Sequence, residues 1–260
     1  MRILPVLSHF ANTTNVLIAD KKAPIIVPFG PAYSGKTNIL CRLFYYFRQR
    51  NYYIKPNLMF VSGNLSSAYE ETMDNFVDGL SECYIPGPTT EMPLFFDVLS
   101  DRSNLVCHIL DQAGTSHFNK NDVDNPVCLE EIFRCPNKKV WLFVLDSCWE
   151  DENVKQFYIE RIIDMKTIID PHDKVIFVAT KADMFFDSKN LFYEVKSIYS
   201  RLFDVFKNTN PITRLIRPYN FDFVAFSAGT FSKSVEITGV YSMGDNKYPE
   251  ALWNTITKSI

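Results

Sequence analysis

The stretch GPAYSGKT, Gly30–Thr37, follows the apolar run APIIVPF and leads into Lys36–Arg50, a segment of helix-favouring residues. It matches the pattern G-x-x-x-x-G-K-[ST], whose backbone N–H groups wrap a phosphate chain at the amino end of a helix. Lys36 would reach the β- and γ-phosphates, and the Thr37 hydroxyl would take one place on Mg²⁺. The pattern lies between a strand and a helix, which is the context that it needs. We therefore predict a phosphate-binding loop rather than a turn that binds nothing, with ligand-binding residues Gly30, Tyr33, Ser34, Gly35, Lys36 and Thr37.

Apolar runs and helical patterns alternate along the rest of the chain. KVWLFVLD (139–146), KVIFVATKAD (174–183) and FDFVAFSAG (221–229) are typical of strands buried on both faces of a sheet. Residues 152–170 and 188–206 have apolar side chains at helical spacing. This alternation predicts an α/β fold, a three-layer sandwich in which helices cover both faces of a mostly parallel sheet. Ligands of such sheets bind at the carboxyl ends of the strands.

A hairpin and three further segments complete the expected organisation. PLFFDVLS and NLVCHILD are separated by DRS alone, which fits a hairpin that adds one antiparallel edge strand. Residues 1–22 form an amino-terminal extension, and residues 51–88 and 230–247 are insertions, the second with a short hairpin. We expect the whole chain, residues 1–260, to be one domain.

The composition is that of a globular protein with an ample core. The 260 residues carry a formal net charge of −3, with 47% hydrophobic and 22% charged residues. No run of Lys and Arg marks a surface for nucleic acid or anionic membrane. The six cysteines are scattered without a C-x-x-C pair, so we expect free thiols in a reducing compartment rather than a zinc site. No stretch approaches the ~20 apolar residues of a membrane span, and the start is too polar for a secretory signal. We expect a cytoplasmic location.

The segment TKAD, Thr180–Asp183, follows a buried strand and can select the base of a nucleotide. The Asp183 carboxylate would accept hydrogen bonds from guanine N1–H and the exocyclic amine, an arrangement that adenine lacks. Lys181 would lay its aliphatic stem along the base. In FSAG, Ser227 and Ala228 suit a tight loop whose backbone N–H meets guanine O6. Alone, TKAD would indicate only a solvated loop pair, but together with the phosphate loop it favours guanine.

The ordered set GPAYSGKT, PTTE, LDQAG, TKAD and SAG resembles the five G-motifs of Ras-like P-loop GTPases of the translation-factor-related (TRAFAC) class. The resemblance covers about residues 23–260 apart from the two insertions. The insertions and a poor match to eukaryotic small GTPases indicate a bacterial branch such as the double-GTPase group. The resemblance implies a six-stranded sheet with five helices, binding of GTP or GDP with Mg²⁺, and two switch segments that rearrange with the γ-phosphate.

The resemblance also implies roles for residues between the two loops. Asp111, in LDQAG, is expected to hold Mg²⁺ through water, and the N–H of Gly114 to sense the γ-phosphate. Thr89, or its neighbour Thr90, is expected to close over the nucleotide and ligate Mg²⁺ when GTP is bound. The expected metal ligands are Thr37, Thr89 and Asp111, and the expected catalytic residues are Lys36, Thr89, Gly114 and His117.

The sequence departs from the family where the attacking water is positioned. Ras-like enzymes place a glutamine directly after the D-x-x-G glycine, whereas this chain has Thr115 there and Gln112 inside the motif. His117 either takes the water-positioning role or is an ordinary exposed histidine of a switch loop. Tyr33 puts a bulky ring beside the phosphate loop. No arginine is placed as a finger, so we expect slow intrinsic hydrolysis that a partner or dimerisation accelerates.

Two functions fit these residues. The first is a GTP-dependent molecular switch with slow hydrolysis, whose protein effector or activating partner recognises one nucleotide state. The second is a nucleotide-locked pseudo-GTPase, an interaction module in which Thr115 and Tyr33 accompany a loss of turnover. Release of phosphate distinguishes the two. TKAD disfavours a third class, an ATP-dependent kinase or ATPase, and the oligomeric state stays open.

Overall fold

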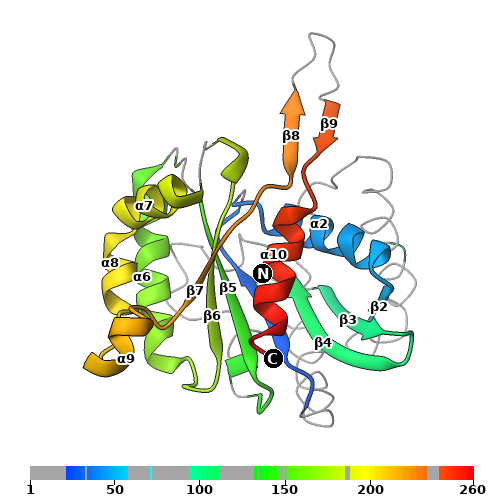
Figure 1. Cartoon of the computed structure of the whole chain (residues 1–260), viewed down its shortest axis with the longest axis horizontal. Coiled ribbons are helices and arrows are strands. Elements are labelled where there is room, and N and C mark those ends of the chain that lie inside the picture. The colour runs from blue at the N-terminus through cyan, green and yellow to red at the C-terminus, as the bar shows by residue number, and fades with distance from the viewer. Residues whose placement is uncertain are drawn as a thin grey trace, which may run out of the picture.

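The computed structural model describes residues 22–32, 34–57, 71, 94–111, 132–133, 135–146, 149, 151–184, 188–232 and 240–260. In these residues, seven strands form one sheet in the order β2-β3-β4-β1-β5-β6-β7, and helices cover both of its faces (Figure 1). The strands are β1 Ile25–Phe29, β2 Tyr52–Pro56, β3 Leu94–Ser100, β4 Asn104–Asp111, β5 Lys139–Leu145, β6 Lys174–Ala179 and β7 Asp222–Ala225. The predicted three-layer α/β sandwich is confirmed.

The middle of the sheet is parallel. β1 lies between β4 and β5 and is parallel to both, and β5, β6 and β7 are parallel in turn. β3 is antiparallel to β4, which confirms the hairpin predicted from PLFFDVLS and NLVCHILD. The carboxyl ends of β1, β4, β5, β6 and β7 therefore meet at one edge, which we call the carboxyl edge, and the segments that follow them come together there.

The sheet has one strand more than the six expected. The added strand, β2, lies at the start of residues 51–88, which were expected to form an insertion. It follows the helix α2 through a turn at Asn51, which has a φ of 59°, and its sequence YYIKP begins with strand-favouring residues. Because β2 pairs with β3, the antiparallel strand β3 lies one place inside the edge instead of forming it.

Three helical segments were predicted above, and the structure forms all three, one of them with a break. They are α2 Lys36–Gln49, α6 Glu152–Ile168, α7 Ser188–Ile198, α8 Ser200–Val205, α9 Pro211–Ile216 and α10 Lys247–Thr257. Residues 188–206 were expected to form one helix, and the structure breaks it at Tyr199. The Tyr199 ring is buried, and its hydroxyl donates a hydrogen bond of 2.7 Å to the Asp146 carbonyl. This contact fixes the chain where α7 ends. The short helix α9 was not predicted.

Two apolar cores lie on opposite faces of the sheet, because successive side chains of a strand point to opposite faces. On one face, Phe143 and Phe177 pack with α6, α7 and α8. On the other face, Leu142 and Ile176 pack with α2 and α10. This arrangement explains why β5 and β6 are apolar along their length, with no polar face to show a period of two.

A separate two-stranded sheet projects from the body of the molecule (Figure 1). β8 (Gly229–Ser232) and β9 (Val240–Met243) form it in antiparallel pairing, in the region where the sequence predicted a hairpin. At its base the Gly244 N–H donates to the Ala228 carbonyl, 3.2 Å, and the Arg42 guanidinium of α2 donates to the Gly244 carbonyl, 2.8 Å. The hairpin is thus tied to the loop after β7 and to the helix after the phosphate loop.

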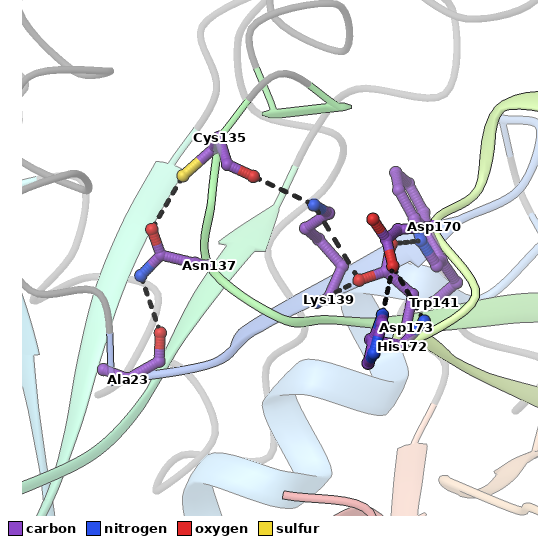
Figure 2. A network of polar contacts seen from close by, with 8 residues as sticks. All are labelled: Ala23, Cys135, Asn137, Lys139, Trp141, Asp170, His172 and Asp173. Atoms are coloured by element: carbon purple, nitrogen blue, oxygen red, sulfur yellow. Dashed lines mark hydrogen bonds and ion pairs between the residues drawn. The ribbon is translucent and has the colours of Figure 1, made fainter.

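A polar network lies at the opposite end of the sheet, where β5 and β6 begin (Figure 2). The buried Asp173 carboxylate accepts hydrogen bonds from the Lys139 backbone N–H, 2.8 Å, and from Trp141 Nε1, 3.1 Å. Lys139 Nζ donates to the Cys135 carbonyl, 3.0 Å. Burial raises the pKa of Asp173, and its hydrogen bonds oppose the rise. The network joins the start of β5 to the turn before β6.

Two further expectations concern the cysteines and membrane segments. Cys41, Cys107 and Cys135 are free thiols in buried positions, and the other three cysteines lie outside the described residues. Within the described residues, every helix is too short or too polar to cross a membrane.

Candidate functional site

The loop from Gly30 to Gly35 connects β1 to α2 at the carboxyl edge. Gly35 has a φ of 94°, a conformation that favours glycine, and it directly precedes α2. A Cβ at Gly30 would lie 2.7 Å from the Ser34 Oγ and 3.2 Å from the Val144 Cβ, so these two side chains would have to shift to admit it. The local geometry therefore favours glycine at both positions of the pattern, and the loop leads to the amino end of α2 at the carboxyl edge.

Lys36 points back into this loop. Its Nζ donates to the carbonyl oxygens of Gly30, 2.7 Å, and Pro31, 2.8 Å, and the residue is only 5% exposed. Burial lowers the pKa of Lys36 to about 8, and the negative charge of Asp111 acts in the opposite direction. A poorly solvated ammonium is stabilised by any anion that reaches it. The loop thus combines a buried cation with a helix amino end, the two features that bind phosphate.

Ser34 adds a polar group to the same loop. The residue is 4% exposed, and its Oγ makes no hydrogen bond to any residue that the structure describes. A buried hydroxyl without a partner costs free energy that a ligand can recover.

Asp111 and Thr37 are the described residues that were predicted to hold Mg²⁺. Asp111 ends β4, which lies beside β1, and it is buried at 8% exposure. Thr37 is half-buried in the first turn of α2. A carboxylate and a hydroxyl oxygen are ligands that Mg²⁺ accepts while it keeps several of its waters. The chemistry of this donor set fits the expected ion.

The TKAD segment follows β6 at the same edge. Thr180 is fixed by its backbone N–H, which donates to the Leu145 carbonyl at 3.0 Å. Lys181 has a φ of 59°, and its Nζ donates to Asp146 Oδ2 at 2.9 Å. Asp183 lies in a 3₁₀ turn, Ala182–Met184, with its side chain exposed. The carboxylate predicted to read guanine is thus open to solvent, as a ligand contact requires.

Backbone hydrogen bonds join TKAD to the SAG loop after β7. The Ala182 N–H donates to the Phe226 carbonyl, 3.1 Å, and the Phe226 N–H donates to the Ala179 carbonyl, 2.8 Å. Ser227 is 2% exposed, and Ala228 is half-buried. The structure therefore brings together the two segments that were predicted to hold the base.

Sequence reasoning missed Asp146 and Tyr158. Asp146 follows β5, is 7% exposed, and accepts the Lys181 hydrogen bond described above. The buried Tyr158 hydroxyl of α6 lies 2.9 Å from each of two carbonyl oxygens, those of Phe29 and Val144. Burial raises the pKa of Tyr158 well above its ordinary value. An acid directly after a buried strand could have pointed to Asp146, whereas helical spacing marked Tyr158 only as a core residue.

Several predicted residues lie outside the described part of the chain. These are Tyr33, Thr89, Thr90, Gln112, Gly114, Thr115 and His117. Their roles in metal binding, γ-phosphate sensing and hydrolysis stay predictions.

A hollow of about 380 Å³ lies between α7 and β7. Lys189, Phe192, Tyr193, Phe223 and Ala225 line it, and none of them was predicted to bind nucleotide.

No family model matches the chain, and no curated protein matches it either. Among solved structures, it is similar to Toc33 from Arabidopsis thaliana, at 13% identity and a TM-score of 0.49, over 98% of this chain and 92% of that one. It is similar to the Ski7 GTPase-like domain from S. cerevisiae bound to GDP and inorganic phosphate, at 14% identity and a TM-score of 0.45. This similarity covers 94% of this chain and 51% of the Ski7 chain. A third similar structure is the SRb-GTP/SRX signal recognition particle receptor complex from Chaetomium thermophilum, at 13% identity and a TM-score of 0.44. This similarity covers 91% of this chain and 98% of that one.

The carboxyl edge brings together four groups of different chemistry. They are the buried cation of Lys36, the oxygen donors of Thr37 and Asp111, the exposed carboxylate of Asp183, and the SAG backbone that is hydrogen-bonded to TKAD. The first group suits a phosphate, the second a metal ion, and the last two a nucleotide base. The carboxyl edge is therefore a candidate nucleotide-binding site.

Proposed function

We propose that the chain is a Ras-like P-loop GTPase of the TRAFAC class, a single G domain that binds GTP and GDP with Mg²⁺ and acts as a molecular switch. The observation that carries the proposal is the Lys36 ammonium, which is buried at the amino end of α2 and donates hydrogen bonds to the Gly30 and Pro31 carbonyls. We further propose that the protein is bacterial and acts in the cytoplasm.

Phosphate binding uses the loop and the first turn of α2. Lys36 would exchange the two loop carbonyls for β- and γ-phosphate oxygens, while backbone N–H groups and the Ser34 hydroxyl contact the chain of phosphates. Thr37 and Asp111 would hold Mg²⁺, with Asp111 acting through water. When bound, Mg²⁺ neutralises charge on the β- and γ-phosphates.

Guanine recognition uses the two loops that the backbone hydrogen bonds join. The exposed Asp183 carboxylate would accept from guanine N1–H and the exocyclic amine, and an N–H at Ser227 or Ala228 would donate to guanine O6. Lys181, oriented by Asp146 and by its own left-handed backbone, would cover the base with its aliphatic stem. Thr180 would hold the start of this loop through its hydrogen bond to Leu145.

The switch and the hydrolysis are proposed from the sequence. Thr89 would close over the nucleotide, Gly114 would sense the γ-phosphate, and His117 would position water where Thr115 stands in place of a glutamine. A protein effector or activating partner would recognise the GTP state and accelerate a slow reaction. Thr115 and Tyr33 depart from the pattern of Ras-like enzymes, and they favour a second candidate function, a nucleotide-locked pseudo-GTPase. Such a protein would release no phosphate over many hours.

The test is displacement of a fluorescent GDP analogue from the intact chain by GTP, GDP and ATP in Mg²⁺. We expect guanine nucleotides to compete at micromolar levels or below, ATP to fail, and Asp183→Asn to lose the preference. Asp164→Asn, which changes an exposed acid of α6, serves as the control and should behave like the intact chain. Equal competition by ATP would show that guanine is not selected. A loaded protein that exchanges nothing would favour the locked module.

A further inference from the structure

The short helix α9 presents three aliphatic side chains to solvent. Ile212, Leu215 and Ile216 are 77%, 89% and 89% exposed, and the helix buries none of its residues. Their i, i+3, i+4 spacing places them on one face of the helix. We call these three residues the aliphatic tip. Single exposed apolar residues are ordinary, whereas a contiguous group of this kind marks an interaction site.

The tip is held in a defined conformation. The Asn210 side chain accepts hydrogen bonds from the N–H groups of Ile212, 3.0 Å, and Thr213, 3.3 Å. At the base, the Asn208 N–H donates to the Pro218 carbonyl, 2.9 Å, which joins the two ends of the segment. The apolar side chains are therefore displayed by a closed loop rather than by a frayed end.

The surroundings of the tip are basic. No Asp or Glu occurs between Lys207 and Asp222, while Arg214 and Arg217 lie in that interval. The acids stand at the base, where Asp222 pairs with Arg217 at 3.0 Å and Asp204 pairs with Lys207. These pairs are exposed and therefore weak, so an anionic surface can compete for the cations. The three cations, Lys207, Arg214 and Arg217, are spaced along one segment, so they do not form a run of Lys and Arg in the sequence.

We propose that the aliphatic tip inserts into an anionic membrane surface as a peripheral contact. Exposed aliphatic side chains flanked by Arg and Lys are the combination that anionic lipid surfaces bind. A stable protein interface buries about 800 Å² per partner and is anchored mainly by aromatic residues and Arg. Three aliphatic side chains on a six-residue helix provide neither that area nor an aromatic anchor.

The position of α9 agrees with such a contact. α9 precedes β7, whereas the nucleotide loops follow the carboxyl ends of β6 and β7. The tip and the candidate nucleotide site therefore lie at opposite ends of the sheet (Figure 1). A membrane bound at the tip leaves the carboxyl edge accessible.

The test is flotation of the intact chain with vesicles of phosphatidylcholine, alone or with about a third phosphatidylserine. We expect binding to the anionic vesicles with a constant on the order of 10⁴ M⁻¹, as for one acyl chain, and weaker binding at high salt. The combined variant Ile212→Asn, Leu215→Asn, Ile216→Asn should lose at least tenfold, and Arg214→Glu several-fold. Tyr193→Asn, which removes a 66% exposed apolar side chain from α7, is the matched control and should bind like the intact chain.

Two results would overturn the proposal. The first is equal flotation of the intact chain and the combined variant, or no flotation of either, with unchanged thermal melts showing that both are folded. The second is a dimer in light scattering without vesicles that the combined variant abolishes, which would assign the tip to a second copy of the chain. Because the tip does not use the nucleotide site, Lys36→Ala should float like the intact chain even if nucleotide binding fails.

Discussion

At the scale of the residue, the protonation of Lys36 makes the stability of the folded chain depend on pH. Its pKa is lowered from 10.5 to about 8, so the folded chain holds this proton less tightly than the unfolded chain. The charge on Lys36 therefore destabilises the fold by roughly 3 kcal/mol below pH 8. This penalty shrinks as the pH rises from about 8 towards 10.5, where the unfolded chain also loses the proton. A phosphate that pairs with the ammonium removes the penalty.

The first prediction is that nucleotide binding takes up a proton above pH 8. Because phosphates raise the pKa of Lys36, a side chain that is mostly neutral at pH 9 becomes charged in the complex. Titration calorimetry with GDP in two buffers of different ionisation enthalpy measures the uptake. We expect more than half a proton at pH 9 and about none from this group at pH 6.5. The same uptake at both values would show that Lys36 does not meet the phosphates.

The second prediction concerns Asp146, a positioning residue that acts through Lys181. Asp146→Asn keeps the volume but removes the charge that holds the ammonium at 2.9 Å. We expect the affinity for GDP to fall about 3- to 10-fold, the scale of a partly exposed charged hydrogen bond. Displacement of the fluorescent GDP analogue measures the loss. As the control, Asp222→Asn breaks the exposed ion pair with Arg217, 3.0 Å, and should leave the affinity for GDP unchanged. Equal effects of the two variants would show that Asp146 does not act through Lys181.

At the scale of the element, Tyr199 joins three segments of the structure. Its hydroxyl donates to the Asp146 carbonyl and accepts from Trp149 Nε1 at 2.5 Å. The third prediction is that Tyr199→Phe leaves both groups without this partner and lowers the free energy of unfolding by about 1–3 kcal/mol. Urea unfolding measures the change. Tyr193→Phe, at an exposed position of α7, should unfold like the intact chain, and coincident curves for the two variants would contradict the prediction.

The same element shows where sequence reasoning stops. Apolar spacing runs unbroken through 188–206, so it predicts one helix, and the break at Tyr199 depends on a hydrogen bond to a residue 53 positions away. The buried strands β5 and β6 were found because they are apolar at every position after their first lysine. β2 was missed because it is short, begins just after a helix, and lies in a region that fits no family motif. Local sequence patterns thus located most of the helices and strands, whereas the break at Tyr199 depends on a tertiary contact.

At the scale of the whole molecule, a ligand that binds only the folded chain must stabilise it. The fourth prediction is that Mg²⁺ with GDP at 100 times its dissociation constant adds about 2.7 kcal/mol and raises the melting temperature by roughly 5 °C. We expect ATP to give no shift and EDTA to reduce the shift with GDP, because Thr37 and Asp111 then hold no metal. A thermal melt followed by circular dichroism measures this. An EDTA-insensitive shift would argue against the metal ligands.

The residues of the candidate site that lie close together in the sequence were predictable from it. Gly30, Gly35, Lys36 and Thr37 form a continuous pattern whose geometry follows from the sequence alone. Asp183 and Ala228 were assigned because TKAD and FSAG follow buried strands in a chain that also has a phosphate loop, and their proximity depends on the Ala182–Phe226 hydrogen bond. Asp146 and Tyr158 escaped notice because their partners are far away in the sequence.

The two cores have a consequence for how the chain unfolds. Each central strand gives alternate side chains to the helices on either face, so removal of one helical layer would expose half of every central strand to water. An intermediate that keeps only one layer is therefore unfavourable, and we expect the two layers to be lost together. The apolar rows that such an intermediate would expose are also the surfaces on which partly folded chains aggregate, so cooperativity here protects solubility as well as structure.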